Sequence, residues 1–377
     1  RDLLLASGAL AVPAFAAGYA AQTPVRTVPD AGPATLRQRA DRKGLLVGAA
    51  VEMPLLTQDA RLQQALREDA NILVPEISLK WAHVQPTRDG PLQFDRAEKI
   101  YQFAVANRMQ MRGHALTWWR EEPKWAQELI PTLSPGKAGD LLTDYITKVV
   151  THWKGRIVQW DVCNEPIDAK DQLMEPLFSK VLGEQYIDLC YQAARAADPN
   201  CLLVFNHDWI AQEHWWQQKQ RAATGRLLER LMKRNVPIDA FGIEGHLMTQ
   251  EQFSETAWRN FCQQVTDMGL KIMITEFDVD DKSVAGDVQA RDAAVAALGG
   301  AFLDVTMSFP NCMGLLTWGT SDRNTWLRNE PTRSRTDKSP LRPLPRDDEY
   351  RRKPLWNVMA AAIDRATPRK MPVGRRA

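Results

Sequence analysis

Hydrophobic residues recur along the chain in short, continuously apolar runs, which begin after residue 44. Their length and their lack of polar alternation are typical of strands buried on both faces, as parallel sheets require. The eight runs cover residues 45–51, 72–77, 109–117, 157–165, 202–208, 238–246, 271–278 and 312–319.

Amphipathic stretches separate these runs. In the clearest of them, residues 95–108, 140–153 and 290–305, apolar side chains recur at the i, i+3, i+4 and i+7 spacing of a helix that packs one face on a sheet. This repeated alternation of strand and helix predicts an α/β fold, a (β/α)8 TIM barrel in a single domain. A doubly wound open sheet is the alternative, but no glycine-rich phosphate loop follows the first strand.

The predicted barrel covers residues 43–367. A polar, proline-containing leader over residues 23–42 precedes it, and a basic tail over residues 368–377 follows it. Residues 320–350 are polar and too numerous for a simple connection. Loops of this length in a compact domain are usually functional or disordered.

Residues 1–22 combine one basic residue, an apolar run and small side chains, which is typical of an export signal and too short for a membrane span. We therefore predict the remnant of an export signal, a periplasmic or extracellular location and no membrane anchoring. Arg1, followed by an aspartate and leucines, fits the second half of a twin-arginine signal and points to that export route. A disordered or helical N-terminal arm is the alternative.

The composition narrows the classes of partner. With 44% hydrophobic residues, 25% charged residues and a net charge of +2, the chain predicts neither a nucleic-acid groove nor a membrane-binding face. We expect a monomer. The five cysteines lack paired spacing, which argues against a disulfide framework and against a structural zinc site. Thirteen tryptophans suit stacking on sugar rings, although core packing must account for most of them.

Polar side chains gather at the C-terminal end of seven of the eight apolar runs. In a barrel these ends open on one face, where the active sites of such enzymes lie. Any one of the residues could cap a helix or satisfy a buried group, but seven such ends on one rim indicate a functional site. The residues are Glu76, His114, Asn164, Glu165, Asn206, Asp208, Glu244, His246, Glu276, Asp278 and Trp318.

Two carboxylates stand out, Glu165 at the end of the fourth run and Glu276 at the end of the seventh. Opposed carboxylates without a cluster of histidine metal ligands suit cleavage of a glycosidic bond, with neither metal nor cofactor. Such a pair needs different pKa values. We expect desolvation to raise the pKa of Glu165 and nearby donors to keep Glu276 ionised. A buried ion pair is the alternative for Glu165 alone.

Four segments of the chain combine these strand-end residues with their neighbours: WDVCNEP (160–166), ITEFD (274–278), RGHALTWW (112–119) and LLTWGTSDRNTW (315–326). They resemble the motifs of glycoside hydrolase family 10, chiefly endo-β-1,4-xylanases. Their order and spacing agree with the family from about Leu45 to Trp356, and RRKPLW is similar to the segment that opens its last helix. The resemblance implies a retaining hydrolase that acts on xylan or its oligosaccharides.

The resemblance also implies a role for each matching residue. Glu165 would be the acid/base and Glu276 the nucleophile, with their carboxyl groups about 5–5.5 Å apart. Asn164 would bond the sugar 2-hydroxyl, and His246 would bond Glu276. The attacked sugar would meet His114, Trp318 and Trp326, and the next sugar outward Glu76 and Lys80. Further candidates for substrate binding are Trp118, Trp119, Asn206 and Glu244, although core packing is a strong alternative for Trp118, as it is for Trp153 and Trp160.

The chain departs from the family pattern at four positions. Ile77 stands where the family usually has an asparagine, and Trp119 where it usually has a histidine. Glu244 replaces a common glutamine, so a third carboxyl group near the nucleophile should be protonated or paired and should titrate with it. His207 is either a one-residue bulge or a substitute for an aspartate. These departures leave open a hydrolase for a different β-glycan, a barrel that binds glycan without cleaving it, and, least favoured, a metal-dependent hydrolase.

Overall fold

The computed structural model describes residues 29–174 and 176–371. The predicted export signal over residues 1–22, the first part of the leader and the last part of the basic tail lie outside this range. Within it, no helix has both the length and the hydrophobicity needed to cross a membrane.

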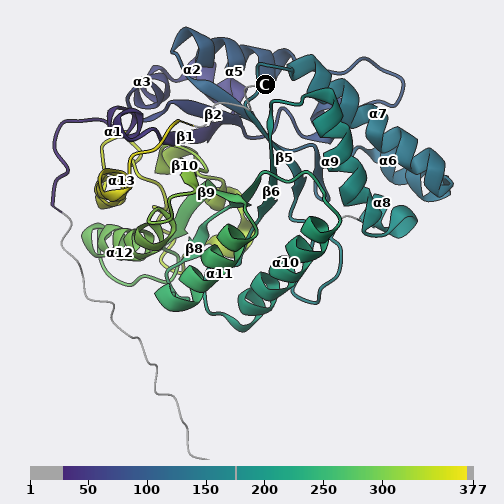
Figure 1. The fold of residues 1–377 in the computed structure, drawn as a ribbon. Helices are drawn as coiled ribbons and strands as arrows, with labels where there is room; N and C mark the ends of the chain where they lie inside the picture. Colours follow the sequence, from purple (N-terminus) through teal and green to yellow (C-terminus); the bar gives the residue numbers. More distant parts are fainter. Residues whose placement is uncertain (1–28, 175, 372–377) are drawn as a thin grey trace, which may run out of the picture.

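Eight parallel strands close into a barrel, so the predicted (β/α)8 fold is confirmed (Figure 1). The last strand pairs with both its predecessor and the first strand, which leaves no open edge. Each strand lies in one of the predicted apolar runs, although β9 continues two residues beyond its run. The barrel strands are β1 (Leu46–Val51), β2 (Ile72–Pro75), β3 (Gln110–Gly113), β5 (Gln159–Asn164), β6 (Leu202–His207), β7 (Ala240–Ile243), β9 (Lys271–Asp280) and β10 (Cys312–Thr317).

Two short strands extend the C-terminal rim of the barrel. Strand β4 (Thr117–Trp118) pairs with the end of β5, and β8 (His246–Met248) pairs with the end of β9. They fix the backbone just beyond the strand ends, where the candidate site residues lie.

Helices surround the barrel (Figure 1). The three stretches predicted from amphipathic spacing are α5, α7 and α12; α7 begins earlier than expected because Ser134-Pro135 starts it, and proline is favoured in a first helical turn. The helices are α1 (Leu36–Lys43), α2 (Met53–Gln58), α3 (Ala60–Asp69), α4 (Trp81–Val84), α5 (Asp95–Ala106), α6 (Lys124–Leu129), α7 (Pro135–Trp153), α8 (Pro176–Leu182), α9 (Gln185–Ala197), α10 (Trp215–Lys233), α11 (Glu255–Asp267), α12 (Val288–Thr306) and α13 (Pro354–Arg365).

The apolar side chains form two cores. A small cluster that includes Ile72, Val204 and Met273 fills the barrel interior, and a larger one lies between the strands and the helices. Trp153 and Trp160 are fully buried in the larger cluster, as core packing predicts. Trp118 differs from them, because it is half-buried at the rim.

The end of α1 and the beginning of the C-terminal tail meet beside the N-terminal end of β1. The predicted leader ends in helix α1, whose Leu36 and Ala40 are buried in the outer core, so the barrel domain begins earlier than residue 43. The backbone N–H of Arg369 donates to Lys43 O at 2.8 Å. The first residues of the basic tail are therefore packed on the barrel.

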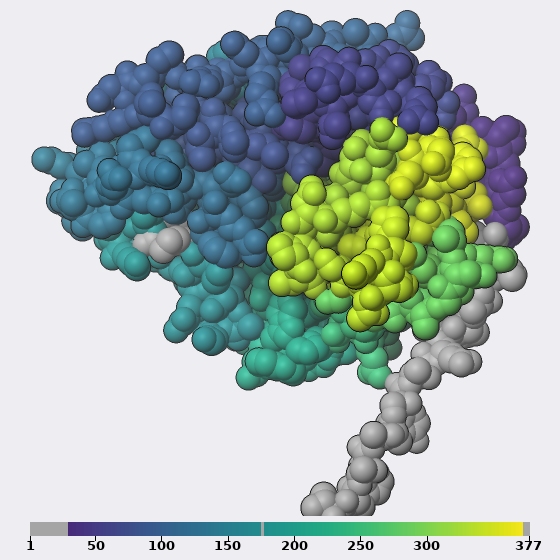
Figure 2. Space-filling view, turned by 180° about the vertical axis from the view of Figure 1, so that it is seen from behind, coloured from purple at the N-terminus to yellow at the C-terminus, as the bar shows by residue number. Residues whose placement is uncertain are grey.

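The polar segment 320–350 is ordered by short 3-10 helices and by buried ion pairs. The 3-10 helices are η2 (Asp322–Asn324), η3 (Trp326–Asn329) and η4 (Pro331–Arg333), and a fourth, η1 (Ile130–Thr132), follows α6. Figure 2 shows the lime to yellow part of the chain that follows β10 as a raised region beside the purple N-terminal elements.

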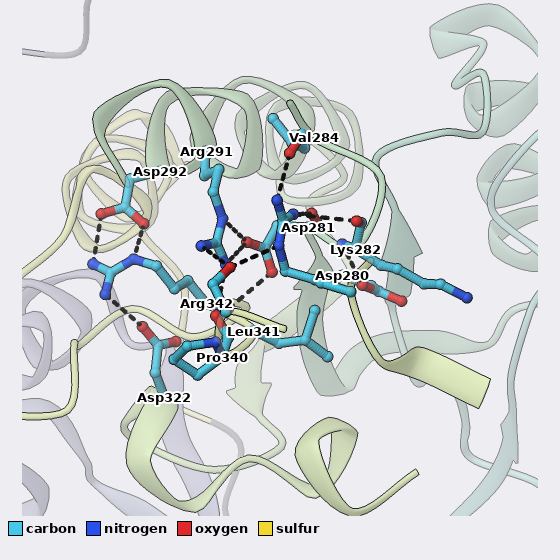
Figure 3. A network of polar contacts seen from close by, with 12 residues as sticks. Asp280, Asp281, Lys282, Val284, Arg291, Asp292, Asp322, Pro340, Leu341 and Arg342 are labelled. Atoms are coloured by element: carbon cyan, nitrogen blue, oxygen red, sulfur yellow. Dashed lines mark hydrogen bonds and ion pairs between the residues drawn. The ribbon is translucent and has the colours of Figure 1, made fainter. Parts of the chain in front are cut away.

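Figure 3 shows how this segment is attached to β9 and α12. Arg291 Nε donates to Asp281 Oδ2 at 2.6 Å, and the backbone N–H of Arg342 donates to Asp281 Oδ1 at 2.8 Å. The Arg342 guanidinium makes two hydrogen bonds to Asp292, at 2.9 and 2.8 Å. Because Asp281 is completely buried, these contacts hold the segment firmly over the barrel rim.

Candidate active site

The centre of the site is the amide of Asn206 at the end of β6. Its Nδ2 lies 2.7 Å from Asn164 Oδ1, 3.0 Å from Glu276 Oε1 and 3.1 Å from Glu244 Oε1. Its Oδ1 accepts a hydrogen bond of 2.8 Å from the Thr275 hydroxyl. One buried amide thus ties together the ends of four neighbouring strands.

Gly242 on β7 makes room for this amide. A Cβ atom at position 242 would lie 2.1 Å from Asn206 Oδ1, closer than non-bonded atoms approach. Because the Asn206 side chain is fixed by its hydrogen bonds on both sides, it could not move aside without breaking the cluster.

Two histidines support the Glu276 carboxylate. His246 Nε2 lies 3.4 Å from Glu276 Oε2, and its Nδ1 lies 2.9 Å from Asp278 Oδ1. The indole N–H of Trp326 donates to Asp278 Oδ2 at 2.8 Å. On the other side, His114 Nδ1 lies 3.8 Å from Glu276 Oε1.

Basic side chains around Glu276 decide its charge. Burial alone would raise its pKa, but His114, His246 and Lys80 outweigh burial and lower the pKa below its ordinary value. Burial pulls the pKa of His246 down, whereas Asp278 and Glu276 raise it to about 10. Glu276 is therefore ionised and His246 protonated near neutral pH.

Glu165 lies directly after β5 and has the opposite character. Its side chain is buried, and its φ of 49° is in the left-handed region that non-glycine residues rarely occupy. Burial, reinforced by the Asp208 carboxylate, raises the pKa of Glu165 to about 8. The indole N–H of Trp119 donates to Glu165 Oε2 at 3.2 Å, which orients the carboxyl group.

Glu244 is the third carboxyl group of the cluster. It is almost completely buried, and its Oε2 lies 3.7 Å from His246 Nε2. Burial, together with the Glu276 and Glu165 charges, raises the pKa of Glu244 well above its usual range. This raised pKa agrees with the expectation that a third carboxyl group at this point would be protonated.

A second group of candidates lies across the barrel mouth, after β2. The Lys80 ammonium lies 4.2 Å from the centre of the Trp118 ring. Burial raises the pKa of Glu76, and the positive charge of Lys80 partly offsets this rise. Burial lowers the pKa of Lys80, and the negative charges of Glu276 and other carboxylates partly offset this fall. These polar side chains and the indole face can hold a sugar ring.

Indole and imidazole rings line the space around Glu276. The Trp318 ring centre lies 5.0 Å from that of His114, and the Trp326 ring centre lies 5.2 Å from that of His246, both edge to face. The structure thus brings together all the candidates that the strand-end pattern and the resemblance identified.

The structure shows the surroundings of Ile77 and His207, two of the positions at which the chain departs from the family pattern. Ile77 is half-buried, and its backbone N–H donates to Glu52 Oε2 at 3.1 Å. His207 pairs with Ile243 without a register shift, so it is not a bulge; it lies on the Phe205 side of β6, with ring centres 6.4 Å apart. Nor does it substitute for the aspartate, because Asp208 itself reaches the cluster.

Asp161 is a site residue to which the sequence motifs assign no role of its own. Its Oδ2 lies 2.8 Å from His114 Nδ1, and it forms a buried ion pair with Arg112. The sequence contained a signal, since Asp161 places a charged side chain inside a predicted buried strand. In the structure it lies next to a register shift between β5 and β6. For Asp278, the sequence indicates a polar strand end but not the contact with His246.

Among the described residues, three sets of side chains lie close enough to share an ion, with their ligand atoms within 4.8 Å of one another. The strand-end pattern places all of these residues except Asp161 on one rim, but it does not show which of them come this close. In two sets a histidine nitrogen already lies at hydrogen-bonding distance from an aspartate, and the third is rich in carboxyl groups with raised pKa values. The sets are His114, Asp161 and Glu276; Glu244, His246 and Glu276; and Glu165, Asp208 and Glu244.

Comparison with known proteins shows which family the chain is similar to. Endo-1,4-beta-xylanase C from Phanerodontia chrysosporium is 26% identical over 322 residues, which cover 85% of this chain and 76% of that relative. Endo-1,4-beta-xylanase B from Thermotoga neapolitana is 27% identical over 296 residues, covering 78% of this chain and 82% of that relative.

The solved structure of xylanase 10B from Thermotoga petrophila RKU-1 in complex with xylobiose matches with a TM-score of 0.80 at 25% sequence identity, covering 88% of this chain and 98% of the other. The sequence pattern of glycosyl hydrolase family 10 matches residues 35–362, which span the barrel. The chain therefore belongs to glycosyl hydrolase family 10.

Proposed function

We propose that the protein is a retaining endo-β-1,4-xylanase that hydrolyses internal bonds of xylan. The observation that carries this proposal is the opposite ionisation of two buried glutamates: Glu165 has its pKa raised to about 8, and Glu276 has its pKa lowered. Two carboxyl groups with separated pKa values are what acid-assisted glycosidic cleavage requires. The relatives described above are themselves named xylanases.

In the first step, the Glu276 carboxylate attacks the anomeric carbon while Glu165 gives its proton to the glycosidic oxygen. The bond between that carbon and oxygen breaks, the shortened glycan leaves as an alcohol, and a glycosyl ester forms on Glu276. In the second step, Glu165 takes a proton from water as the water attacks the same carbon. The ester bond breaks, and both glutamates return to their first state.

The surrounding side chains would position the sugar for these steps. Asn164 would bond the 2-hydroxyl group, and His246 would hold the nucleophile through its contact with Glu276. Trp318 and Trp326 would present ring faces to the attacked sugar, and Lys80 with Glu76 would bind the next sugar outward.

A related activity remains a second candidate, namely hydrolysis of a different β-glycan. It is favoured by Trp119, whose indole hydrogen-bonds to Glu165, and by Ile77, which provides no side-chain hydrogen bond where the family usually has an asparagine. A barrel that only binds glycan is disfavoured, because binding alone gives no reason to bury two carboxyl groups with opposed pKa values.

Product analysis on β-1,4-xylan, mixed-linkage glucan and cellulose tests the proposal, with Glu276→Ala as the inactive control. We expect internal cleavage of xylan, seen as a series of xylooligosaccharides. Faster cleavage of another β-glycan would favour the second candidate. No hydrolysis of any β-glycan by the unmodified chain would refute the enzymatic proposal.

We also propose that the protein is exported, by the twin-arginine route, and acts as a monomer. The support for export is the apolar, small-residue sequence of residues 1–22. Cell fractionation of the chain with and without these residues tests export, and retention of both forms in the cytoplasm would contradict it. Light scattering in solution tests the monomer.

A further inference from the structure

The turn after β4 places one arginine, Arg120, at the mouth of the site. Strand β4 pairs with the end of β5, which fixes the backbone before the turn. Within the turn, the backbone N–H of Glu121 donates to Trp118 O at 3.1 Å, and the backbone N–H of Ala82 donates to Glu121 O at 3.0 Å. Arg120 lies between these fixed points and is exposed to solvent. The base of its side chain is therefore held in one place at the surface.

Indole rings lie beneath the Arg120 guanidinium. Its carbon atom lies 4.6 Å from the centre of the Trp119 ring and 5.9 Å from the centre of the Trp118 ring. A guanidinium at such a distance is attracted to the ring face, and its N–H groups can still donate in its own plane. The same Trp119 ring donates its N–H to Glu165 Oε2. One indole thus connects the exposed cation with the proton donor.

The charge of Arg120 is not neutralised by an ion pair within the described part of the chain. The neighbouring Glu121 carboxylate lies instead 3.5 Å from His83 Nε2. Another arginine of the rim, Arg333, pairs with Asp280 at 3.2 Å. Solvation alone accounts for an unpaired arginine elsewhere on a surface. Beside the proton donor, however, the same charge acts on any substrate that reaches the donor.

The electrostatic effect of Arg120 on Glu165 shows that the two groups are close in space. Burial and the Asp208 carboxylate raise the pKa of Glu165, and the Arg120 charge offsets part of this rise. Charges at a surface act on each other over about 8 Å at physiological salt. During cleavage the glycosidic oxygen lies within hydrogen-bonding distance of Glu165. The two sugars that this oxygen joins therefore pass near the guanidinium.

We propose that Arg120 is a specificity-determining residue that makes the enzyme prefer acid-substituted xylan, in which a sugar beside the cleaved bond carries a uronic acid branch. The inference rests on the proposed function and names the preferred form of its substrate. A guanidinium can donate two parallel N–H bonds to a carboxylate, and the Trp119 ring beneath it fixes the plane in which it does so. A neutral chain gains nothing from this contact.

The test compares two xylooligosaccharides of equal length, one of which carries a single glucuronic acid branch. Both are assayed at pH 6, where Glu165 with its pKa of about 8 stays protonated, so that loss of the Arg120 charge does not change the acid. We expect the ratio of kcat/KM for the branched chain to kcat/KM for the unbranched chain to fall about twofold to fivefold in Arg120→Gln, the size of an exposed ion pair. Arg120→Glu should lower the ratio further, and Arg120→Lys should keep part of it.

An exposed arginine at the other end of the barrel supplies the matched control. The Arg259 guanidinium on α11 lies 5.9 Å from the ring of Phe309, which precedes β10 and so lies away from the catalytic rim. Arg259→Gln removes the same charge from a similar ring contact and should leave the ratio unchanged. Circular dichroism of each variant shows that the fold persists.

The methyl ester of the branched chain supplies the second readout, because it keeps the branch but removes its charge. The unmodified chain should cleave the acid about twofold to fivefold faster than the ester, and Arg120→Gln should cleave the two alike. An unchanged ratio in Arg120→Gln, an equal loss on branched and unbranched chains, or no preference of the unmodified chain for the acid over the ester would overturn the inference and leave the proposed function intact. If the unmodified chain cleaved none of these substrates, both proposals would fall.

Discussion

The raised pKa of Glu165 leads to a specific prediction for the pH dependence of activity. A carboxyl group with a pKa of about 8 is protonated below that pH and loses its proton above it. At pH 6 the acid form is then about 99% populated, against about 3% for a glutamate with an ordinary pKa, so burial supplies about thirtyfold more of the proton donor.

We therefore expect kcat/KM for xylooligosaccharides to fall about tenfold for each pH unit above 8, and to stay near its maximum down to the pKa of Glu276. Glu165→Gln should lower kcat/KM on these substrates by about 10² to 10⁴, the usual contribution of a general acid. On an aryl xylobioside with a strongly acidic phenol, which leaves without protonation, the loss should be much smaller. Glu276→Ala should be inactive on both.

The measurement is a series of pH–rate profiles for the unmodified chain and for Glu165→Gln on the activated substrate, with circular dichroism to confirm that the fold persists across the range. The alkaline fall should disappear in the variant. If a fall near pH 8 persisted there unchanged, another group, such as Glu244 or Lys80, would be responsible for it. An equal loss of activity on both substrate types would show that the acid role is wrongly assigned.

Three further predictions concern the support of the site. Glu244→Gln should keep kcat/KM at pH 6 within about threefold, because a protonated carboxyl group and an amide offer similar hydrogen bonds; a hundredfold loss would mean that the charged form is needed. Gly242→Ala should lower kcat by at least about tenfold by displacing the Asn206 amide, while the melting temperature shows whether the fold persists; full activity would show that the amide can move without cost. Arg291→Leu should destabilise the protein by about 3–5 kcal/mol in urea unfolding, because it leaves its buried aspartate partner uncompensated. Arg351→Leu, at an exposed ion pair, is the control, and an equal loss in both would contradict the argument.

The sequence allowed the strands and their polar ends to be predicted because both depend on local pattern. A strand buried on both faces shows itself as an apolar run, and Glu165 or Glu276 at its end stands out against that run. The contacts between these ends could not be predicted in the same way. The Asn206 amide reaches Asn164 and Glu276 only because β5, β6, β7 and β9 stand side by side in the closed barrel.

Other features depend on side chains that look ordinary in the sequence. Asp161 lies inside β5, and its role follows from its contact with His114, which follows the neighbouring strand β3. Trp215 lies in a helical stretch in which core packing would be expected, yet its side chain is 63% exposed. Segment 320–350 is polar, which predicts a functional or disordered loop, and only the fold shows that Arg342 pairs with Asp292 on α12 and that Arg328 pairs with Asp348 within the segment.

The hydrogen bond from Arg369 to Lys43 has a consequence for engineering of this barrel. It places the beginning of the tail next to the end of α1, beside the end of β1 that faces away from the catalytic rim. A linker that runs back along the eight residues of α1, about 12 Å, could therefore join the tail to the start of that helix. New ends could be opened in the exposed turn around Gly155 between α7 and β5. Such a circularly permuted chain would keep every strand end of the site in place, so the order in which the strands are synthesised could be changed independently of the chemistry they support.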